Sequence, residues 1–222
     1  MNKLQDKTRT SDGRNLKKYS KDYLSAIEKR QGRGESLTIE EAYQLFSSVQ
    51  ATSTIPGVMA EVGVYKGGSA VILCEAKGNR PLYLFDTFTG MPMSEVSTDA
   101  DTWGRKTHQD TSVEGVQEFL SEYPKVEIIP GIFPQSIPEQ FKSMSFSFVN
   151  LDVDLYQPTL EALKFFWPRM SVGGRLISHN YNSVCYDIDD TPGVKKAFKE
   201  YFKDSPHLIV EVAETQCLVM KC

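Results

Sequence analysis

The chain has 222 residues, of which 40% are hydrophobic, and it carries a net charge of -4 with a pI near 5.5. This length fits one large α/β domain, and an acidic chain without a concentrated basic face is not expected to bind nucleic acid. No segment has the apolar length of a membrane span, and residues 1–14 are too polar for a signal sequence. We therefore expect no membrane partner and a cytoplasmic location.

The first 35 residues are charged and contain few aliphatic side chains. We expect residues 1–35 to form an N-terminal arm that is flexible or lid-like, with one short helix between Tyr19 and Ile27. Such an arm could also hold two copies together as a homodimer. Residues 36–222 would form the folded domain. There, Thr38 followed by Glu41 is a capping-box pattern and predicts a helix over residues 39–49.

The stretch Gly57 to Ser69 reads G-V-M-A-E-V-G-V-Y-K-G-G-S. An apolar run that breaks into glycines predicts a buried strand, a tight turn and a helix beginning near Gly67. Glycines let a ligand approach the backbone, and the free N–H groups of a helix start favour an anionic group. The dinucleotide fingerprint G-x-G-x-x-G is absent because Tyr65 replaces its second glycine. A nucleoside cradle and a turn without a ligand are both compatible with this stretch.

Strands and helices alternate along the rest of the chain. Strands are expected at 82–85, 126–131, 146–154, 175–181, 207–213 and 217–222, and helices at about 111–120, 159–167 and 192–202. The intervening segment 89–111 has no periodicity and is typical of a lid or a binding loop. Alternation predicts a doubly wound, mostly parallel α/β sheet, and the short turn before the last strand predicts a terminal antiparallel hairpin.

Polar residues and a glycine follow the carboxyl ends of these strands. Ligands of doubly wound sheets bind beyond those ends. An acid after the second strand typically accepts hydrogen bonds from a ribose, although Asp86 could equally be a turn-initiating residue. The residues that we expect to converge there are Glu61, Asp86, Gly131, Asp152, Asp154, His179 and Asn180.

Five ordered blocks carry a resemblance to a known family. They read E-V-G-V-Y-K-G-G-S, F-D-T-F-T-G-M-P, G-I-F-P-Q-S-I-P, L-D-V-D-L-Y-Q-P-T and G-G-R-L-I-S-H-N-Y. In this order they resemble the macrocin O-methyltransferase family, within the class I S-adenosylmethionine-dependent methyltransferases. The resemblance covers about residues 55–202 and implies a Rossmann-like fold with a seven-stranded sheet.

The resemblance also implies S-adenosylmethionine as the cofactor. Its methionine part would lie in the turn from Glu61 to Ser69, with the Glu61 carboxylate near the ammonium group. Asp86 and Thr87 would take the ribose, and Gly131, Ile132 and Phe133 would flank the adenine. The complete implied set is Glu61, Gly63, Tyr65, Gly67, Gly68, Ser69, Asp86, Thr87, Gly131, Ile132, Phe133 and Asp152.

Magnesium is a second cofactor that the resemblance implies, with ligands from the D-x-D block and an acidic pair after the fifth strand. Asp154 keeps the first position, but His179 and Asn180 replace the acidic pair. Magnesium prefers oxygen ligands, which Asp154 and the Asn180 carbonyl could supply and His179 could not. We expect a retained but degraded metal site at Asp154 and Asn180; a metal-free site with His179 as base is the alternative.

The implied reaction is methyl transfer to a hydroxyl group of a small molecule, a sugar of a glycoside, polysaccharide or sugar nucleotide. A hydroxyl is a weak nucleophile and needs a base, for which His179 and His108 are the candidates. For each histidine a purely structural role is an equal alternative. Two other functions remain open: a non-catalytic nucleoside-binding protein on the same fold, and a nicotinamide-dependent oxidoreductase.

Overall fold

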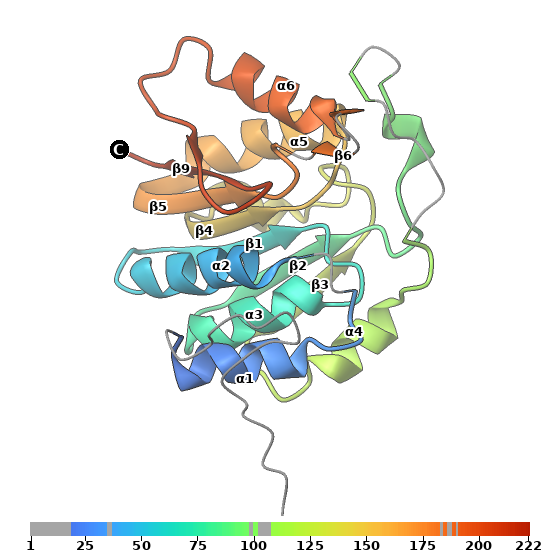
Figure 1. The fold of residues 1–222 in the computed structure, drawn as a ribbon, viewed down its shortest axis with the longest axis vertical. Coiled ribbons are helices and arrows are strands. Elements are labelled where there is room, and N and C mark those ends of the chain that lie inside the picture. Colours follow the sequence, from blue (N-terminus) through green and yellow to red (C-terminus); the bar gives the residue numbers. More distant parts are fainter. Residues whose placement is uncertain are drawn as a thin grey trace, which may run out of the picture.

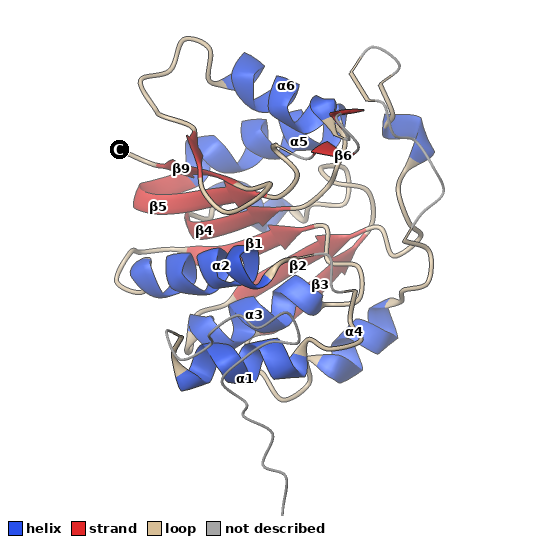
Figure 2. Ribbon diagram, in the orientation of Figure 1, coloured by secondary structure: helices blue, strands red, loops and turns tan. Residues whose placement is uncertain are grey.

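The computed structural model describes residues 19–34, 37–97, 100–101, 108–182, 184–185, 188–189 and 191–222. Its main sheet contains seven strands in the order β3-β2-β1-β4-β5-β9-β8 (Figures 1 and 2). These strands are β1 (Val58–Val62), β2 (Leu82–Asp86), β3 (Val126–Pro130), β4 (Phe146–Leu151), β5 (Met170–Ser178), β8 (Val210–Glu211) and β9 (Cys217–Met220).

The strand directions confirm the predicted doubly wound sheet. β1 pairs in parallel with β2 and β4, β2 pairs in parallel with β3, and β4 pairs in parallel with β5. β9 is antiparallel to both β5 and β8, so the chain closes on the expected hairpin. β1 and β4 are almost entirely buried, as near-continuous apolar runs in a parallel sheet require.

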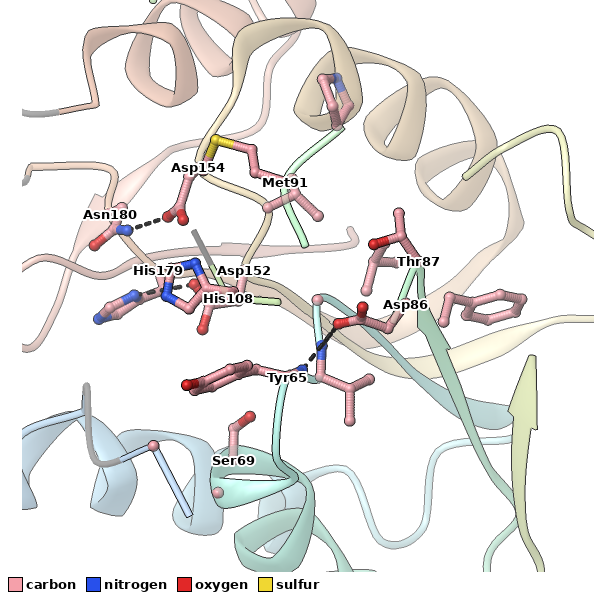
Figure 3. Close-up of a pocket in the computed structure, with 18 of the residues that line it drawn as sticks. Tyr65, Ser69, Asp86, Thr87, Met91, His108, Asp152, Asp154, His179 and Asn180 are labelled. Atoms are coloured by element: carbon pink, nitrogen blue, oxygen red, sulfur yellow. Dashed lines mark hydrogen bonds and ion pairs between the residues drawn. The ribbon is translucent and has the colours of Figure 1, made fainter. Parts of the chain in front are cut away.

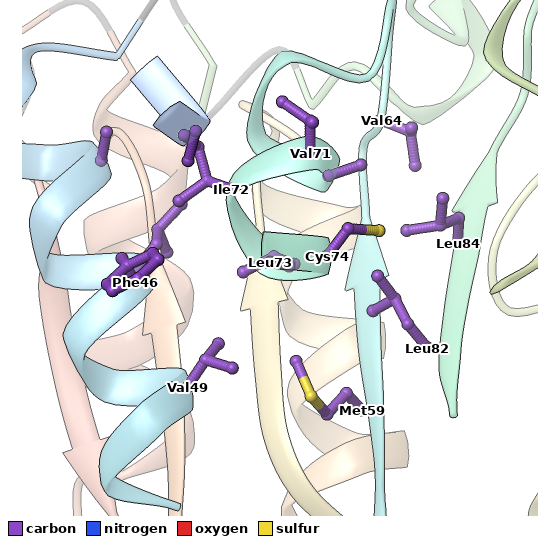
Figure 4. Packing of buried hydrophobic residues seen from close by; sticks show 14 of the residues in the cluster. Phe46, Val49, Met59, Val64, Val71, Ile72, Leu73, Cys74, Leu82 and Leu84 are labelled. Carbon is purple, nitrogen blue, oxygen red and sulfur yellow. The ribbon is translucent and has the colours of Figure 1, made fainter. Parts of the chain in front are cut away.

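Helices cover both faces of the sheet (Figures 1 and 2). One face carries α1 (Lys21–Lys29), α2 (Ile39–Ala51) and α3 (Gly68–Lys77), whose apolar side chains join those of β1 and β2 in one core cluster (Figure 4). On the other face, α5 (Tyr156–Phe166) packs on α6 (Pro192–Tyr201) over a second cluster that is rich in phenylalanine. The candidate site lies between these layers, at the carboxyl ends of the parallel strands.

The remaining elements are short. They are α4 (Val113–Phe119), the 3-10 helices Met93–Glu95, Glu139–Ser143 and Trp167–Arg169, and a two-stranded hairpin of β6 (Val184–Cys185) and β7 (Ile188–Asp189). In the part of the chain that the structure describes, no helix combines the length and apolar character needed to cross a membrane.

The expected N-terminal arm is described only over residues 19–34, and there it is packed on the domain. The predicted short helix is present as α1, with Ser20 Oγ accepting a hydrogen bond from Tyr23 N at 3.2 Å. Tyr23 and Ala26 are fully buried, and Lys29 forms an ion pair with Glu75 of α3 at 2.6 Å. This part of the region thus contributes to the core of the domain.

Three predicted helix starts have different outcomes. The capping box of α2 is confirmed, because Glu41 N donates to Thr38 Oγ1 and Thr38 N donates to Glu41 Oε2. For α4, Thr111 followed by Glu114 is a capping-box pattern that predicts Thr111 as the cap, and this is wrong: Ser112 caps the helix, and the Thr111 hydroxyl donates to the Tyr65 carbonyl instead. α5 begins at Tyr156, three residues before the expected Thr159, because Pro158 is compatible with the first turn of a helix.

Candidate active site

A cavity of about 450 Å³ lies beyond the carboxyl ends of the parallel strands, as predicted for this fold (Figure 3). Most of the predicted site residues line it, and Glu61 and Gly67 do not. The predicted residues in its wall are Gly63, Tyr65, Gly68, Ser69, Asp86, Thr87, His108, Gly131, Ile132, Phe133, Asp152, Asp154, His179 and Asn180. Residues from distant parts of the chain therefore meet in one site.

Asp86 holds the glycine turn that follows β1. Its Oδ2 accepts hydrogen bonds from Val64 N at 2.6 Å and Tyr65 N at 2.8 Å, and its Oδ1 accepts one from Phe88 N at 2.7 Å (Figure 3). An ionised carboxylate can accept about four hydrogen bonds in all. Asp86 thus combines the turn-forming role that the sequence left open with room for a further donor in the cavity.

Gly63 allows β1 and β4 to approach closely below the cavity. Its φ is +88°, and a Cβ at this position would lie 1.9 Å from the carbonyl oxygen of Asp152. The backbone is fixed on both sides, because Gly63 N donates to Phe85 O and Asp152 N donates to Val62 O, each at 2.9 Å. Glycine is therefore required here by both conformation and space.

Glu61 is fully buried behind this turn. Its Oε1 accepts a hydrogen bond from Asn150 Nδ2 at 2.8 Å, whereas its Oε2 has no hydrogen-bond partner among the described residues. Burial raises the pKa of the Glu61 carboxyl to about 8, and hydrogen bonds from Ser69 and Asn150 offset only part of that rise. The raised pKa keeps the Glu61 carboxyl group protonated at neutral pH, and a nearby cation would favour its ionised form.

The variant Glu61→Gln tests whether the buried Glu61 carboxyl has a raised pKa, through the pH dependence of the unfolding free energy. Because the folded pKa of about 8 exceeds the ordinary 4.5, Glu61 contributes stability that is complete below about pH 4.5 and is lost as pH rises through 8. We expect the unfolding free energy of the wild type to fall relative to the variant between pH 5 and 9, by up to about 4 kcal/mol. Urea denaturation at several pH values measures this, and parallel pH profiles would contradict it.

His179 bridges two carboxylates that come from different elements. Its Nδ1 lies 3.1 Å from Asp152 Oδ1 after β4, and its Nε2 lies 3.5 Å from Glu41 Oε1 on α2. Burial alone would lower the pKa of His179, but the charges and hydrogen bonds of Asp152 and Glu41 raise it well above its usual 6.5. His179 is therefore a buried cation at neutral pH, with both ring nitrogens directed at acids.

Glu41 is a site residue that sequence reasoning missed. Besides capping α2, it accepts hydrogen bonds from Thr215 N at 3.0 Å and Thr215 Oγ1 at 2.7 Å, in the turn between β8 and β9. Burial would raise the pKa of Glu41, but His179, Thr38 and Thr215 together lower it to about 2. From the sequence, Glu41 is assigned only to the capping box of α2, although its helix neighbours Ala42 and Leu45 face the core.

Asp154 and Asn180 form a second pair in the wall of the cavity, next to His179 and Asp152 (Figure 3). Asn180 Nδ2 donates a hydrogen bond to Asp154 Oδ1. Burial and the nearby charge of Asp152 raise the pKa of the Asp154 carboxyl to about 6, and Asn180 partly opposes this rise. The pair is held in place from behind, because Asn180 O accepts a hydrogen bond from Thr191 Oγ1 at 2.8 Å.

A family model described as Macrocin-O-methyltransferase matches residues 37–207, which are most of the chain. The chain belongs to this family. One relative, the 8-demethyl-8-(2,3-dimethoxy-alpha-L-rhamnosyl)-tetracenomycin-C 4'-O-methyltransferase of Streptomyces olivaceus, is 32% identical over 57% of this chain and 54% of its own length. Two further curated relatives are matched over 59% and 65% of their lengths, so the chain spans less than two thirds of each.

Solved structures place this member of the macrocin O-methyltransferase family in the class I methyltransferase fold. The structure of the O-methyltransferase NovP aligns with a TM-score of 0.68 at 22% identity, over 82% of this chain and 80% of that chain. An O-methyltransferase from Bacillus cereus in complex with SAH aligns with a TM-score of 0.57 at 13% identity, over 91% and 92%. The predicted Rossmann-like fold is thereby confirmed.

The cavity fits the methyl donor that this family membership implies. Gly63 and Gly68 line the cavity without side chains, and their packing against Asp152 O and Arg33 O leaves no room for a Cβ at either position. Behind the wall of the cavity, the unpartnered Glu61 Oε2 suits a nearby cationic group, and in the wall Ile132, with 37% of its surface exposed, supplies an apolar contact. Phe133 instead belongs largely to the core, where its ring stacks on Phe166 at 5.3 Å.

His108 brings the described end of the loop segment 89–111 to the cavity. Its ring lies 4.8 Å from that of Tyr65, whose hydroxyl donates to Asp110 Oδ1 at 2.6 Å. Lys66 also forms an ion pair with Asp110. Residues 108–111 are thus attached to the glycine turn, while residues 98–99 and 102–107 of the expected lid lie outside the described residues.

Proposed function

We propose that this protein transfers a methyl group from S-adenosylmethionine to a hydroxyl group of a small molecule, a sugar unit of a glycoside, polysaccharide or sugar nucleotide. The observation that carries the proposal is the glycine turn held by Asp86 at the mouth of a 450 Å³ cavity. Membership of the macrocin O-methyltransferase family supports the reaction, and the rhamnosyl substrate in the name of the Streptomyces olivaceus relative supports the sugar.

The donor would lie along the ends of β1, β2 and β3. Asp86 would accept hydrogen bonds from the ribose while keeping those of the turn, and Ile132 would contact the adenine. The ammonium group would ionise Glu61, directly or through Ser69, which lines the cavity and lowers the pKa of the Glu61 carboxyl. Thr87 stabilises the neighbouring loop by donating from its hydroxyl to Gly90 O at 2.7 Å.

The acceptor would occupy the other half of the cavity, between Asp154, Asn180 and the segment that carries His108. Further polar side chains there, from Thr191 and Thr215, suit a ligand with several hydroxyl groups. Polar groups in such a site reject analogues that leave them unpaired, which favours a sugar over an apolar phenol. This half of the cavity is therefore the source of acceptor specificity.

When bound, the donor supplies a sulfonium methyl; the acceptor oxygen forms the new C–O bond as the S–C bond breaks, and the hydroxyl proton passes to a base. We assign the base to His108, which lines the cavity, rather than to His179. Both nitrogens of His179 face carboxylates, so its ring has no acceptor position for a substrate proton. The contacts with Asp152 and Glu41 thus prevent the His179 ring from acting as the base.

A methyl-transfer assay tests the proposal. Labelled S-adenosylmethionine is incubated with the protein and a panel of nucleotide sugars, rhamnosides and phenols, and we expect label on a sugar acceptor. Asp86→Ala should raise the KM for the donor by about 5- to 150-fold, because it removes ribose hydrogen bonds worth about 1 to 3 kcal/mol and the acceptor for the turn. Asp204→Asn, an exposed control, should leave the KM unchanged.

The outcomes separate the alternatives. Donor binding without transfer to any acceptor would favour a non-catalytic nucleoside-binding protein. An unchanged donor KM in Asp86→Ala would overturn the ribose assignment, even if transfer is observed.

A further inference from the structure

The positions expected to hold magnesium are hydrogen-bonded to one another instead. Magnesium requires an octahedral set of oxygen ligands. Asn180 turns its amide nitrogen, not its carbonyl oxygen, toward Asp154 Oδ1. The opposite amide orientation would place two oxygens against each other. A protein donor thus occupies the side of Asp154 that a cation shared with Asn180 would need.

His179 occupies the position of the other expected ligand, and its ring nitrogens are directed at acids other than Asp154. Its Nδ1 lies 3.1 Å from Asp152 Oδ1, and its Nε2 lies 3.5 Å from Glu41 Oε1. An imidazole ring has only these two nitrogens as donors or acceptors. Neither nitrogen is therefore left to coordinate a metal ion at Asp154, and a ring nitrogen suits magnesium poorly in any case.

The surrounding residues fix this arrangement. His179 N donates to Leu151 O at 2.9 Å as a continuation of the sheet, and only 7% of the residue is exposed. Glu41 is exposed by 1% and is held by Thr38 and Thr215. Asn180 N donates to Thr215 Oγ1 at 3.3 Å. Rotating the His179 or Asn180 side chain to direct a lone pair at a metal would leave the buried acids without hydrogen-bond donors. That would raise the free energy of the folded protein.

We propose that His179 and Asn180 take the place of the divalent cation in this chain, so that the site binds no metal. The His179 ring holds Asp152 and Glu41, and the Asn180 amide holds Asp154. His179 is then a positioning residue. The expectation of a degraded magnesium site at Asp154 and Asn180 is replaced by a site in which protein side chains contact the acids that a metal would bind.

This inference rests on the proposed function only in placing His179 and Asn180 at a catalytic site. Its test measures metal binding in the absence of the methyl donor, so it does not depend on methyl transfer. Mn²⁺ serves as the probe, and its binding is followed by electron paramagnetic resonance with the wild type, with His179→Asp/Asn180→Asp and with that double variant carrying Asp154→Asn. The wild type should bind no Mn²⁺ at this site. The double variant should gain affinity by at least about tenfold, and Asp154→Asn should remove the gain.

Two results would overturn the proposal. One is a wild-type Mn²⁺ site that Asp154→Asn abolishes. The other is a correctly folded double variant that binds no Mn²⁺, because His179 and Asn180 would then not be what excludes the metal. If the double variant does not fold, His179→Asn/Asn180→Asp replaces it, since this pair changes both positions and restores one carboxylate ligand; a gain in Mn²⁺ affinity supports the proposal, and no gain overturns it.

Discussion

Replacing Gly63 by alanine should destabilise the protein by about 3 to 5 kcal/mol and abolish binding of the methyl donor. The left-handed backbone at φ +88° costs any residue with a Cβ about 1 kcal/mol, and contact with Asp152 O at 1.9 Å adds the larger share. Neither strand can move to relieve this contact, because Gly63 N and Asp152 N both donate hydrogen bonds to neighbouring strands. Urea denaturation gives the free energy, and calorimetry gives the donor affinity.

Gly32→Ala is the matched control for Gly63→Ala. Gly32 has a similar φ of +75°, but a Cβ there would meet nothing within 4 Å. We therefore expect this variant to lose only about 1 kcal/mol and to bind the donor as the wild type does. Equal losses in the two variants would mean that the close approach of β1 and β4 contributes nothing.

Replacing Glu41 by glutamine should cost about 3 to 5 kcal/mol at neutral pH, because it leaves the buried His179 cation short of one of its two acids. The folded pKa of Glu41, about 2, lies below its ordinary 4.5. Its stabilisation is therefore complete above about pH 4.5 and is lost as pH falls through 2. The difference between variant and wild type should be constant from pH 5 to 8 and shrink below pH 4.5.

Glu118→Gln, on the exposed side of α4, is the control for Glu41→Gln and should change stability by less than about 0.5 kcal/mol. Denaturant unfolding at each pH provides the comparison. If Glu41→Gln unfolds like this control, the bridge between α2 and His179 is not a stabilising ion pair.

The strands and the edge of the sheet that holds the site could be predicted because both depend on local patterns. β1 and β4 are buried on both faces and read as unbroken apolar runs, which fixes them as parallel strands. Once the strands are known, residues such as Asp86 and Asp154 must meet at one edge, since the carboxyl ends of parallel strands lie together. The structure brings these two residues to one cavity.

The partners of His179 could not be predicted, because they depend on contacts between distant parts of the chain. Glu41 has a sufficient local explanation as a helix cap, and nothing near it in sequence points to a histidine 138 residues later (179 − 41). The packing of α1 was missed for the same reason, since the Tyr23 ring contacts Tyr43 and Phe46 of α2 and not only its neighbour Tyr19. The β6 and β7 strands of two residues each carry no periodic signal.

Calorimetric titration of the wild-type protein with S-adenosylhomocysteine tests the central claim most directly, because it needs no acceptor. We expect one site with a Kd on the order of micromolar and an affinity for S-adenosylhomocysteine that a chelator does not change. No heat of binding up to about millimolar ligand would contradict the assignment of the cavity to the methyl donor.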